Sequence, residues 1–434
     1  MADKEVPQGR LGRFVRLATM GARTSAGLLW NVEGSAKQTA EVLGNLRGLA
    51  AKIGQMASYV DGVVPEAQRE AYESALSKLR SQAPRSSLAQ VRALLVAELG
   101  GNLEQHFARF DDDPIASASI GQVHAAWLHD GTKVAVKVQH PGIDKAVESD
   151  LANASMLESV LGALGGNRFD SKTLLAVVRE RFREELDYTL EAERAKGFAN
   201  EHRGDPRVII PRVFETHSTK RVLTVEFVDG KCFEEACLAS ESERRAWAET
   251  LWRFTFKSMM GGALLHADPH PGNYVFQEHG RVVFLDYGCV QGLGSEHRAR
   301  AILVHRLALA NEDEAFESAS KALLGTRPGQ LEQPSVDYMR HCLQPLFHTP
   351  YRITRSYAAQ LVSEMKALAL AVRKVPADQV MTMPPHMLFV NRLQFGLYSV
   401  LARLDVAADY AGVERTIFKE LSTQGRLPEL TASA

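Results

Sequence analysis

The feature that most constrains this chain is a turn-rich run at residues 266–273, HADPHPGN, followed by the run DYG at 286–288. Asp-Pro and Pro-Gly pairs mark turns, so the first run is expected in a loop. Phosphoryl transfer requires a carboxylate beside the attacking oxygen and oxygen ligands that hold Mg²⁺ against the phosphates. The two runs together contain side chains for both tasks.

Three residues of these runs are assigned roles. Asp268 is the candidate carboxylate, whereas Asn273 and Asp286 are candidate Mg²⁺ ligands, because Mg²⁺ is a hard cation that prefers oxygen. The order H-x-D, asparagine and D-[FY]-G is typical of the catalytic loop and metal-binding turn of kinase-like phosphotransferases. Each motif alone is more often an ordinary turn, and their order and spacing favour the catalytic interpretation.

Composition narrows the class of protein. With 434 residues, 45% hydrophobic and 24% charged, the chain can form two or three domains with a buried core. A net charge of −1 gives no reason to expect nucleic-acid binding. The four cysteines include no C-x-x-C pair, which argues against structural zinc or disulfides. No apolar run reaches the ~20 residues of a transmembrane helix, and no signal-peptide core is seen, so we expect a cytoplasmic protein.

A nucleotide-binding loop is predicted upstream. Strands are expected at Phe107–Phe110, Gln122–Leu128 and Lys133–Val138, the last two joined by an Asp130-Gly131 turn. Compared with the kinase loop G-x-G-x-x-G-x-V, the run ASASIGQV has alanines at the first two glycine positions. Methyl groups restrict close backbone approach to phosphate, so the loop is expected to have altered geometry. Its candidate residues are Ala116, Ser117, Ala118, Ser119, Gly121 and Val123.

Lys137 ends the run VAVK and matches the kinase lysine that contacts the α- and β-phosphates. The alternative is a strand lysine that points to solvent, which its place after the loop and the hairpin disfavours. A kinase lysine needs a carboxylate partner, and the run 184–191 offers four that spacing alone cannot distinguish. Their alternative role is a solvated acidic face balanced by nearby arginines. Glu226 and Val228 lie in a candidate hinge whose backbone can meet adenine.

The chain divides into three expected parts: a helical N-terminal extension at 1–105, a kinase-like N-lobe with a helical insertion at 106–230, and a mainly helical C-lobe at 231–434. Helices are expected over Leu88–Leu99 and, as one long element, over Thr173–Asn200. Strands are expected over Arg207–Glu215 and Arg221–Phe227, and a small hairpin over Tyr274–Gln277 and Arg281–Leu285 leads into Asp286. No A-P-E motif follows Asp286, which counts against a conventional protein substrate.

Arginines at positions 10, 13 and 16 share one face of an expected N-terminal helix. A basic amphipathic helix of this type can make peripheral contact with an anionic membrane. The alternative, which we favour, is a solvated face whose apolar side packs on the protein.

Together these runs resemble the UbiB family of atypical protein-kinase-like proteins, which is linked to ubiquinone and other isoprenoid-lipid metabolism. The resemblance spans residues 40–300 and rests on KIGQ at 52–55, ASASIGQVH at 116–124, VAVKVQHPG at 134–142 and ELDYTLEA at 185–192, besides HADPHPGN and DYG. Many members have Ala-Ala-Ala where this chain has Ala-Ser-Ala. Many bacterial members also carry C-terminal transmembrane helices. No such helix is expected in this sequence, so in this respect it is more similar to the soluble mitochondrial type.

The resemblance implies roles that spacing leaves open. Glu191 would pair with Lys137, while Glu185 and Asp187 would receive Lys52 from an extension folded over the cleft where a protein substrate otherwise docks. It further implies an α+β bilobal protein-kinase-like fold with an N-terminal helical extension, ATP and Mg²⁺ as cofactors, and a lipid or lipid-biosynthesis partner. The candidate catalytic set is Asp268, Lys137, Glu191, Lys52, Gln55, Glu185 and Asp187.

Three functions stay open at this point. The first is an atypical kinase or ATPase that supports ubiquinone or other isoprenoid-lipid biosynthesis. The second is a small-molecule phosphotransferase related in its catalytic loop to the aminoglycoside phosphotransferases. The third is a lipid-binding module that ATP switches without true kinase turnover.

We predict that Asp268→Asn abolishes turnover and leaves nucleotide binding largely intact, because the amide keeps the shape of the carboxylate and cannot accept a proton. Phosphate release and nucleotide affinity of the purified variant measure the two effects separately. Loss of folding or of nucleotide binding in this variant would contradict the assigned role.

Overall fold

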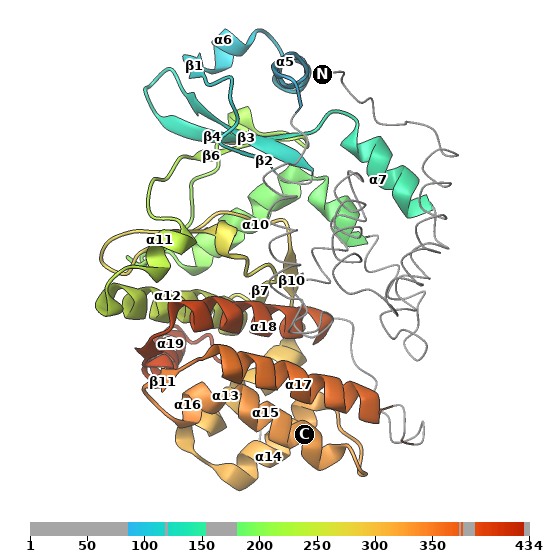
Figure 1. Cartoon of the computed structure of the whole chain (residues 1–434), viewed down its shortest axis with the longest axis vertical. Coiled ribbons are helices and arrows are strands. Elements are labelled where there is room, and N and C mark those ends of the chain that lie inside the picture. Colours follow the sequence, from blue (N-terminus) through green and yellow to red (C-terminus); the bar gives the residue numbers. More distant parts are fainter. Residues whose placement is uncertain (1–85, 118–119, 153–179, 373–374, 376–386, 429–434) are drawn as a thin grey trace, which may run out of the picture. The chain divides into compact units, whose positions relative to one another are not determined.

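Figure 1 shows the computed structural model, which describes residues 86–117, 120–152, 180–372, 375 and 387–428. Two compact units are present. The first contains the described residues up to His129 and from Val136 to Phe182, and the second contains Asp130–Ala135 and the described residues from Arg183 onward. The predicted positions that lie outside the described residues are the N-terminal arginines, Lys52, Gln55, Ala118 and Ser119.

The first helix in the described part of the first unit is α5 (Leu88–Leu99), as the sequence predicts. A capping box fixes its start: Gln90 N–H donates to Ser87 Oγ, and Ser87 N–H donates to Gln90 Oε1 at 3.1 Å. The helix ends at Gly100, whose φ of +75° suits glycine. The short helix α6 (Leu103–His106) follows.

Antiparallel strands follow these helices: β1 (Arg109–Phe110), β2 (Ala116–Ser117), β3 (Gly121–Trp127) and β4 (Lys133–Gln139). Both β1 and β2 pair with β3. The sheet order is β1-β3-β4-β6, where β6 is Val222–Glu226. In the predicted turn between β3 and β4, Gly131 has a φ of +85°, and Thr132 N–H donates to Asp130 Oδ1 at 2.9 Å. After β4 comes α7 (Ile143–Ala152).

The single helix expected over Thr173–Asn200 is wrong at its centre. Residues 180–185 are helical, but Leu186 and Asp187 leave the helix, and α10 (Tyr188–Glu201) starts anew. Asp187 is the N-cap of α10, since its carboxylate accepts from Thr189 N–H at 3.0 Å. An aspartate that bonds the following backbone competes with helix continuation, and apolar periodicity does not register that competition.

Small sheets and one long helix frame the second unit. These elements are β5 (Val208–Ile209), α12 (Glu241–Met260), β7 (Leu264–His266), β8 (Tyr274–Phe276), β9 (Val282–Phe284) and β10 (Val290–Gly292). β7 pairs antiparallel with β10, and β8 and β9 form the hairpin that the sequence predicts. The strand expected over Arg207–Glu215 is shorter than predicted, and it pairs in parallel with the distant β9.

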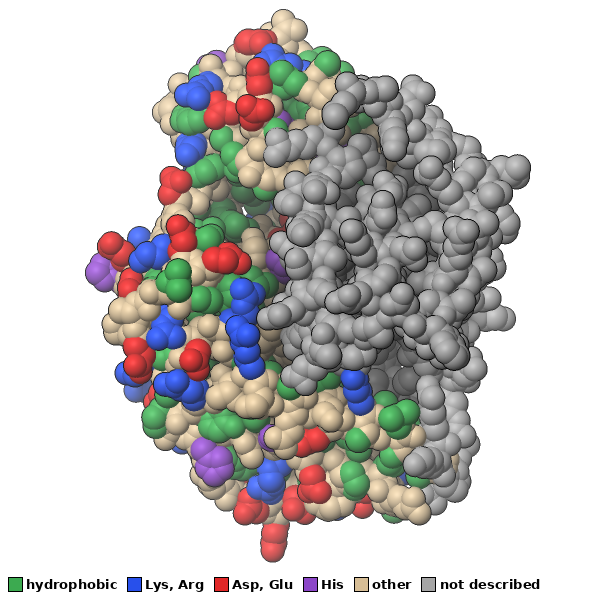
Figure 2. Space-filling model, viewed as in Figure 1, with side chains coloured by type: hydrophobic (Ala, Val, Ile, Leu, Met, Phe, Trp, Pro, Cys, Tyr) green, Lys and Arg blue, Asp and Glu red, His purple; other side chains and the backbone are tan. Residues whose placement is uncertain are grey.

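The rest of the described chain is mainly helical, as predicted. The further elements are η2 (Glu215–His217), α11 (Phe233–Cys237), α13 (Ser295–Ala310), α14 (Asp313–Leu324), α15 (Glu332–Cys342), α16 (Gln344–Phe347), β11 (Tyr351–Arg352), α17 (Arg355–Ala371), α18 (Met387–Leu404), β12 (Ala407–Ala408) and α19 (Tyr410–Thr423). The described helices include none that is long and apolar enough to cross a bilayer. Figure 2 shows acidic and basic side chains interspersed over the described part of one face.

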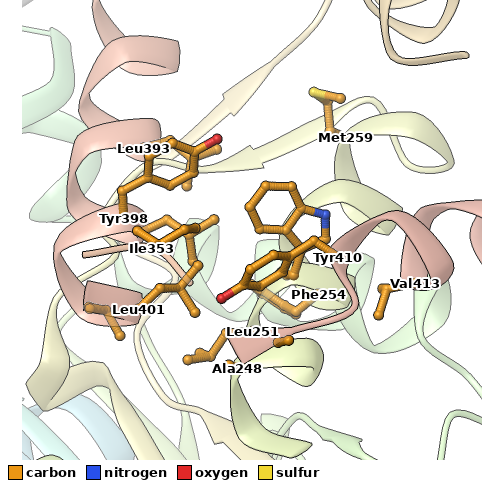
Figure 3. Packing of buried hydrophobic residues seen from close by; sticks show 14 of the residues in the cluster. Ala248, Leu251, Phe254, Met259, Ile353, Leu393, Tyr398, Leu401, Tyr410 and Val413 are labelled. Atoms are coloured by element: carbon orange, nitrogen blue, oxygen red, sulfur yellow. The ribbon is translucent and has the colours of Figure 1, made fainter. Parts of the chain in front are cut away.

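The core of the second unit forms where α12, α18 and α19 pack together (Figure 3). Trp252 of α12 lies 5.9 Å from Tyr398 of α18 and 4.5 Å from Tyr410 of α19, measured between ring centroids. The indole N–H of Trp252 donates to the buried carboxylate of Glu414 at 2.9 Å. Burial of large aromatic rings is the main stabilising term here, and the hydrogen bond satisfies the polar atom of the indole.

Buried charges also join α12 to α19. Arg253 forms ion pairs with Asp205 and, at 2.8 Å, with Glu420. Lys257 forms an ion pair with the same Glu420 at 3.1 Å. Removal of one partner from such a network leaves an uncompensated buried charge, which destabilises the fold. His202 lies beside these charges, hydrogen bonded through Nε2 to Ser258 Oγ at 2.8 Å.

We predict that His202 makes the second unit sensitive to acid. Burial lowers the pKa of His202 from 6.5 to about 3, so only the unfolded chain takes up this proton between those pH values. Stability is therefore full above pH 6.5 and falls on acidification, with a loss of about 1.4 kcal/mol between pH 7.5 and 5.5. Urea unfolding at both pH values measures the loss.

In that experiment, His202→Gln should lose about 1.4 kcal/mol less than the unchanged protein, because glutamine does not titrate. The matched control is His348→Gln, which replaces an exposed histidine and should keep the original pH dependence. Equal acid sensitivity of the two variants would contradict the prediction.

Candidate active site

The predicted catalytic loop starts where β7 ends. His270 N–H donates to the carbonyl of Asp268 at 2.7 Å, and the 3₁₀ turn η3 (Pro271–Asn273) follows. Asn273 Nδ2 donates to the carbonyl of Asp268 at 3.0 Å and to its carboxylate at 3.3 Å. The loop therefore brings two predicted site residues into direct contact.

The predicted metal turn is joined to this loop through the backbone. Leu285 N–H donates to the carbonyl of Asn273 at 3.0 Å, at the open end of the β8–β9 hairpin. His266 Nε2 is hydrogen bonded to the carbonyl of Asp286. Gly288 N–H donates to Asp286 Oδ1 at 2.9 Å. Asn273 thus accepts the backbone bond from Leu285, and Asp286 is the next residue after that donor.

Tyr287 anchors the metal turn in the core. Its ring centroid lies 5.2 Å from that of Phe198 on α10 and 5.5 Å from that of His266. Its hydroxyl donates to the carbonyl of Phe284 at 3.0 Å. Burial, together with nearby carboxylates, raises the pKa of Tyr287 well above its usual range. The hydroxyl therefore stays protonated and remains a donor at physiological pH.

The donors at these two turns suit Mg²⁺. Because Nδ2 of Asn273 donates to Asp268, its Oδ1 is the atom that a cation would meet, and Asp286 offers a carboxylate. Mg²⁺ is often held by one or two carboxylates, with water and substrate phosphates completing its shell. No group of three or more histidine, cysteine, aspartate or glutamate side chains in the described chain is arranged to hold a metal. The donor set thus fits a cation that arrives with phosphate ligands.

Carboxylates from the run 184–191 gather at the same turn. A Cβ placed on Gly288 would lie 3.2 Å from Asp286 Oδ1, 3.8 Å from Glu191 Oε2 and 4.0 Å from Glu185 Cγ. Glu191 is only 3% exposed. Asp187, which the resemblance assigned to Lys52, uses its carboxylate to cap α10. A side chain at position 288 would press on the candidate ligand Asp286, which explains the glycine.

Arg194 belongs to this site, although the sequence placed it among arginines that balance an acidic face. Its Nη1 donates to the carbonyl of Gly288 at 2.9 Å, and its Nη2 donates to Glu184 Oε2 at 2.5 Å. The sequence did carry one signal for it. Arg194 follows Glu191 by three residues on α10, and residues at that spacing share a helix face.

The nucleotide-loop candidates lie in the first unit. In the antiparallel register of β2 and β3, Ala116 lies opposite Val123, and Ser117 precedes the loop that returns to Gly121. Lys137 lies on the face of β4 opposite to the buried valines at 134, 136 and 138. The structure thus places these candidates on adjoining strands.

A buried chain of hydrogen bonds, which the sequence analysis missed, fixes the start of β3. Ser86 N–H donates to Gln122 Oε1 at 2.9 Å, and Gln122 Nε2 is hydrogen bonded to His124 Nε2 at 2.8 Å. His124 Nδ1 in turn meets the carbonyl of Asp111 at 2.9 Å. Burial lowers the pKa of His124, which favours the neutral ring that this chain of bonds requires.

The predicted hinge is held by its neighbours. Glu226 N–H and Phe227 N–H donate to backbone carbonyls of adjacent segments at 2.8 and 3.1 Å. Gly230 runs so close to β8 that a Cβ there would lie 2.6 Å from Val275 Cγ1. These contacts fix the backbone on both sides of Val228.

Helix α18 supports the catalytic loop, and the sequence analysis found no motif in it. A Cβ on Gly396 would lie 2.3 Å from Pro269 Cγ, well inside any normal contact distance. The helix therefore touches the loop through its backbone. The available signal was a glycine inside an apolar helix, where propensity disfavours it.

Comparison with known families and proteins supports a kinase-like architecture. The family model for the ABC1 atypical kinase-like domain matches residues 78–318, more than half of the chain. The mitochondrial atypical kinase COQ8 of Saccharomyces cerevisiae is 32% identical over 245 residues, which cover 56% of this chain and 48% of that protein. AarF domain-containing protein kinase 1 of Mus musculus is 32% identical over 271 residues, 61% of this chain and 51% of that protein. The chain thus spans about half the length of these relatives.

A solved structure from Mycobacterium tuberculosis, the complex of Rv3197 with erythromycin, matches with a TM-score of 0.63 and 28% identity. The match covers 91% of this chain and 98% of that chain. Together with the family model, it confirms the kinase-like α+β fold that the sequence predicts.

We predict opposite effects of alanine at two helical glycines. Helix propensity alone favours alanine over glycine by about 1 kcal/mol. Gly197→Ala on α10 should show this gain, because its Cβ would meet Leu264 Cδ1 at an ordinary 3.7 Å. Gly396→Ala should instead lower the free energy of unfolding, because its Cβ would collide with Pro269. Urea unfolding of both variants is the measurement, and a gain in both would contradict the proposed contact.

Proposed function

This chain belongs to the ABC1 atypical kinase-like (UbiB) family, and from that premise we propose that it binds ATP with Mg²⁺ and either hydrolyses ATP or transfers its terminal phosphoryl group. The backbone bond of 3.0 Å from Leu285 to Asn273 carries the proposal, since it brings the two candidate Mg²⁺ ligands together beside Asp268. Phosphoryl transfer depends mainly on positioning and on electrostatic stabilisation, and this arrangement offers both.

In this proposal Asp268 orients the attacking water or hydroxyl. Asn273 Nδ2 holds the carboxylate of Asp268 at 3.3 Å, so its orientation is set before the substrate arrives. Asn273 Oδ1 and Asp286 would hold Mg²⁺, which when bound neutralises charge on the phosphates. By the resemblance, Lys137 would contact the phosphates and pair with Glu191.

The nucleotide is enclosed by the remaining candidates. Ala116 to Val123 cover the phosphates, while the backbone of Glu226 and Val228 meets adenine. By the resemblance, Lys52 and Gln55, which lie outside the described residues, would close over the nucleotide. We propose that the acceptor is water or a small molecule rather than a protein, because no A-P-E segment follows Asp286.

We further propose that this activity supports ubiquinone or another isoprenoid-lipid pathway, from a cytoplasmic site with peripheral contact to the membrane. The name of the yeast relative, an atypical kinase COQ8, supports the link to that pathway. That contact would be made by the arginine face near the N-terminus, against the solvated-face interpretation that the sequence alone favours.

A second candidate is an ATP-switched module that binds a bulky, largely apolar ligand without kinase turnover. The M. tuberculosis structure favours it, because that protein was solved with erythromycin and its match covers 91% of this chain. In this version the nucleotide site is the same, and only the outcome of binding differs.

We predict that the purified protein releases phosphate from ATP and Mg²⁺, and that anionic liposomes with a ubiquinone-precursor mimic raise the rate. Asp286→Asn serves as the blank, because loss of one Mg²⁺ ligand should abolish turnover. Phosphate release is measured with and without lipid, and nucleotide affinity is measured in parallel.

Turnover that rises with lipid and disappears in Asp286→Asn supports the ATPase. Tight nucleotide binding without turnover under every condition supports the switched module instead. Absence of nucleotide binding in the unchanged protein would overturn both candidates.

A further inference from the structure

The guanidinium of Arg194 spans two segments of the candidate site. It joins the metal turn, through the carbonyl of Gly288 at 2.9 Å, to Glu184 at 2.5 Å, just before the break that precedes α10. The side chains of Arg194 and Glu184 are 13% and 20% exposed. Water therefore screens this pair less than it screens the exposed ion pairs of the surface.

The contact at Gly288 leads directly to the candidate Mg²⁺ ligand. The N–H of Gly288 donates to Asp286 Oδ1 at 2.9 Å, while the carbonyl of the same residue accepts from Arg194. Both polar backbone groups of Gly288 are thus engaged. A shift of this residue would move the carboxylate that it holds.

The rest of the turn is fixed by other contacts. His266 is hydrogen bonded to the carbonyl of Asp286, and the Tyr287 hydroxyl donates to the carbonyl of Phe284. Arg194 holds the side of the turn that faces α10, the helix that carries Glu191. Its removal should therefore loosen one side of the turn without unfolding it.

We propose that Arg194 is a positioning residue, which holds Asp286 in its metal-binding orientation by clamping Gly288 to the segment before α10. The role of Asp286 as a metal ligand rests on the proposed function. The contact of Arg194 with Gly288, which we call the clamp, does not depend on it. Two N–H groups of one planar fork serve two partners, whereas lysine presents its donors from a single nitrogen without that fork, so it should hold the two partners less well.

The clamp can be tested without nucleotide, by hydrogen exchange of the peptide that contains residues 285–290. Arg194→Gln should speed exchange of the Gly288 amide about tenfold, the factor that corresponds to ~1.4 kcal/mol. Glu184→Gln should have a smaller effect in the same direction, because it leaves the bond to Gly288 in place. Unchanged exchange in Arg194→Gln would overturn the clamp.

Arg300 provides a matched control within α13. Its Nη2 donates to Glu296 Oε1 at 2.6 Å, and its Nη1 donates to the carbonyl of Ala322 at 3.1 Å. It thus has the same two kinds of partner as Arg194, outside the candidate site. Arg300→Gln should leave exchange at residues 285–290 unchanged.

The role in positioning is tested by the Mg²⁺ dependence of ATP turnover. Arg194→Gln should raise the Mg²⁺ concentration for half-maximal turnover about tenfold, with most of kcat recovered at saturating Mg²⁺. Arg194→Lys should lie between this variant and the unchanged protein. A purely structural arginine would lower the melting temperature and leave the Mg²⁺ dependence unchanged, which would overturn the proposal.

The outcomes separate this proposal from the proposed function. If the unchanged protein shows no Mg²⁺-dependent nucleotide binding, the proposed function fails, while hydrogen exchange still decides whether the clamp exists. If Arg194→Gln does not fold, the comparison of Arg194→Lys with Glu184→Gln decides it. Exchange and Mg²⁺ dependence that match the unchanged protein in both would overturn the clamp.

Discussion

The hydrogen bond from Leu285 N–H to the carbonyl of Asn273 is the contact on which the candidate site depends. It extends the β8–β9 ladder at the open end of the hairpin, where the catalytic loop ends and the metal turn begins. A hairpin brings its two ends together by backbone pairing alone. The backbone positions of Asn273 and Asp286 are therefore set by the strands.

The local parts of this arrangement could be predicted from the sequence. The β8–β9 hairpin, the Asp130-Gly131 turn and the helix α5 all follow from neighbouring residues, whose turn chemistry and capping act over a few positions. The same hairpin brings Leu285, the neighbour of Asp286, into backbone contact with Asn273. Short-range rules reach this far because a hairpin converts sequence spacing into spatial contact.

The parts that the sequence could not predict join distant segments. The close contact of Gly396 with Pro269 and the bond from Arg194 to Gly288 depend on how helices pack, which no local pattern encodes. The parallel pairing of β5 with β9 is of the same kind. The break before α10 is different, because its cause is local. Asp187 acts as an N-cap there. The prediction of one helix over Thr173–Asn200 followed apolar periodicity and gave that capping signal too little weight.

The contacts of the Tyr287 side chain explain why a tyrosine suits this position of the metal turn. A phenylalanine would fill the same space between Phe198 and His266, but it would lack the bond to the carbonyl of Phe284. Because burial keeps the hydroxyl protonated, that bond persists over the whole physiological pH range. Rotation of the Tyr287 ring out of its site would both break this hydrogen bond and expose a large apolar surface. Asp286 is therefore presented by a turn that its own contacts already fix, so a cation bound there would require little further ordering of this turn.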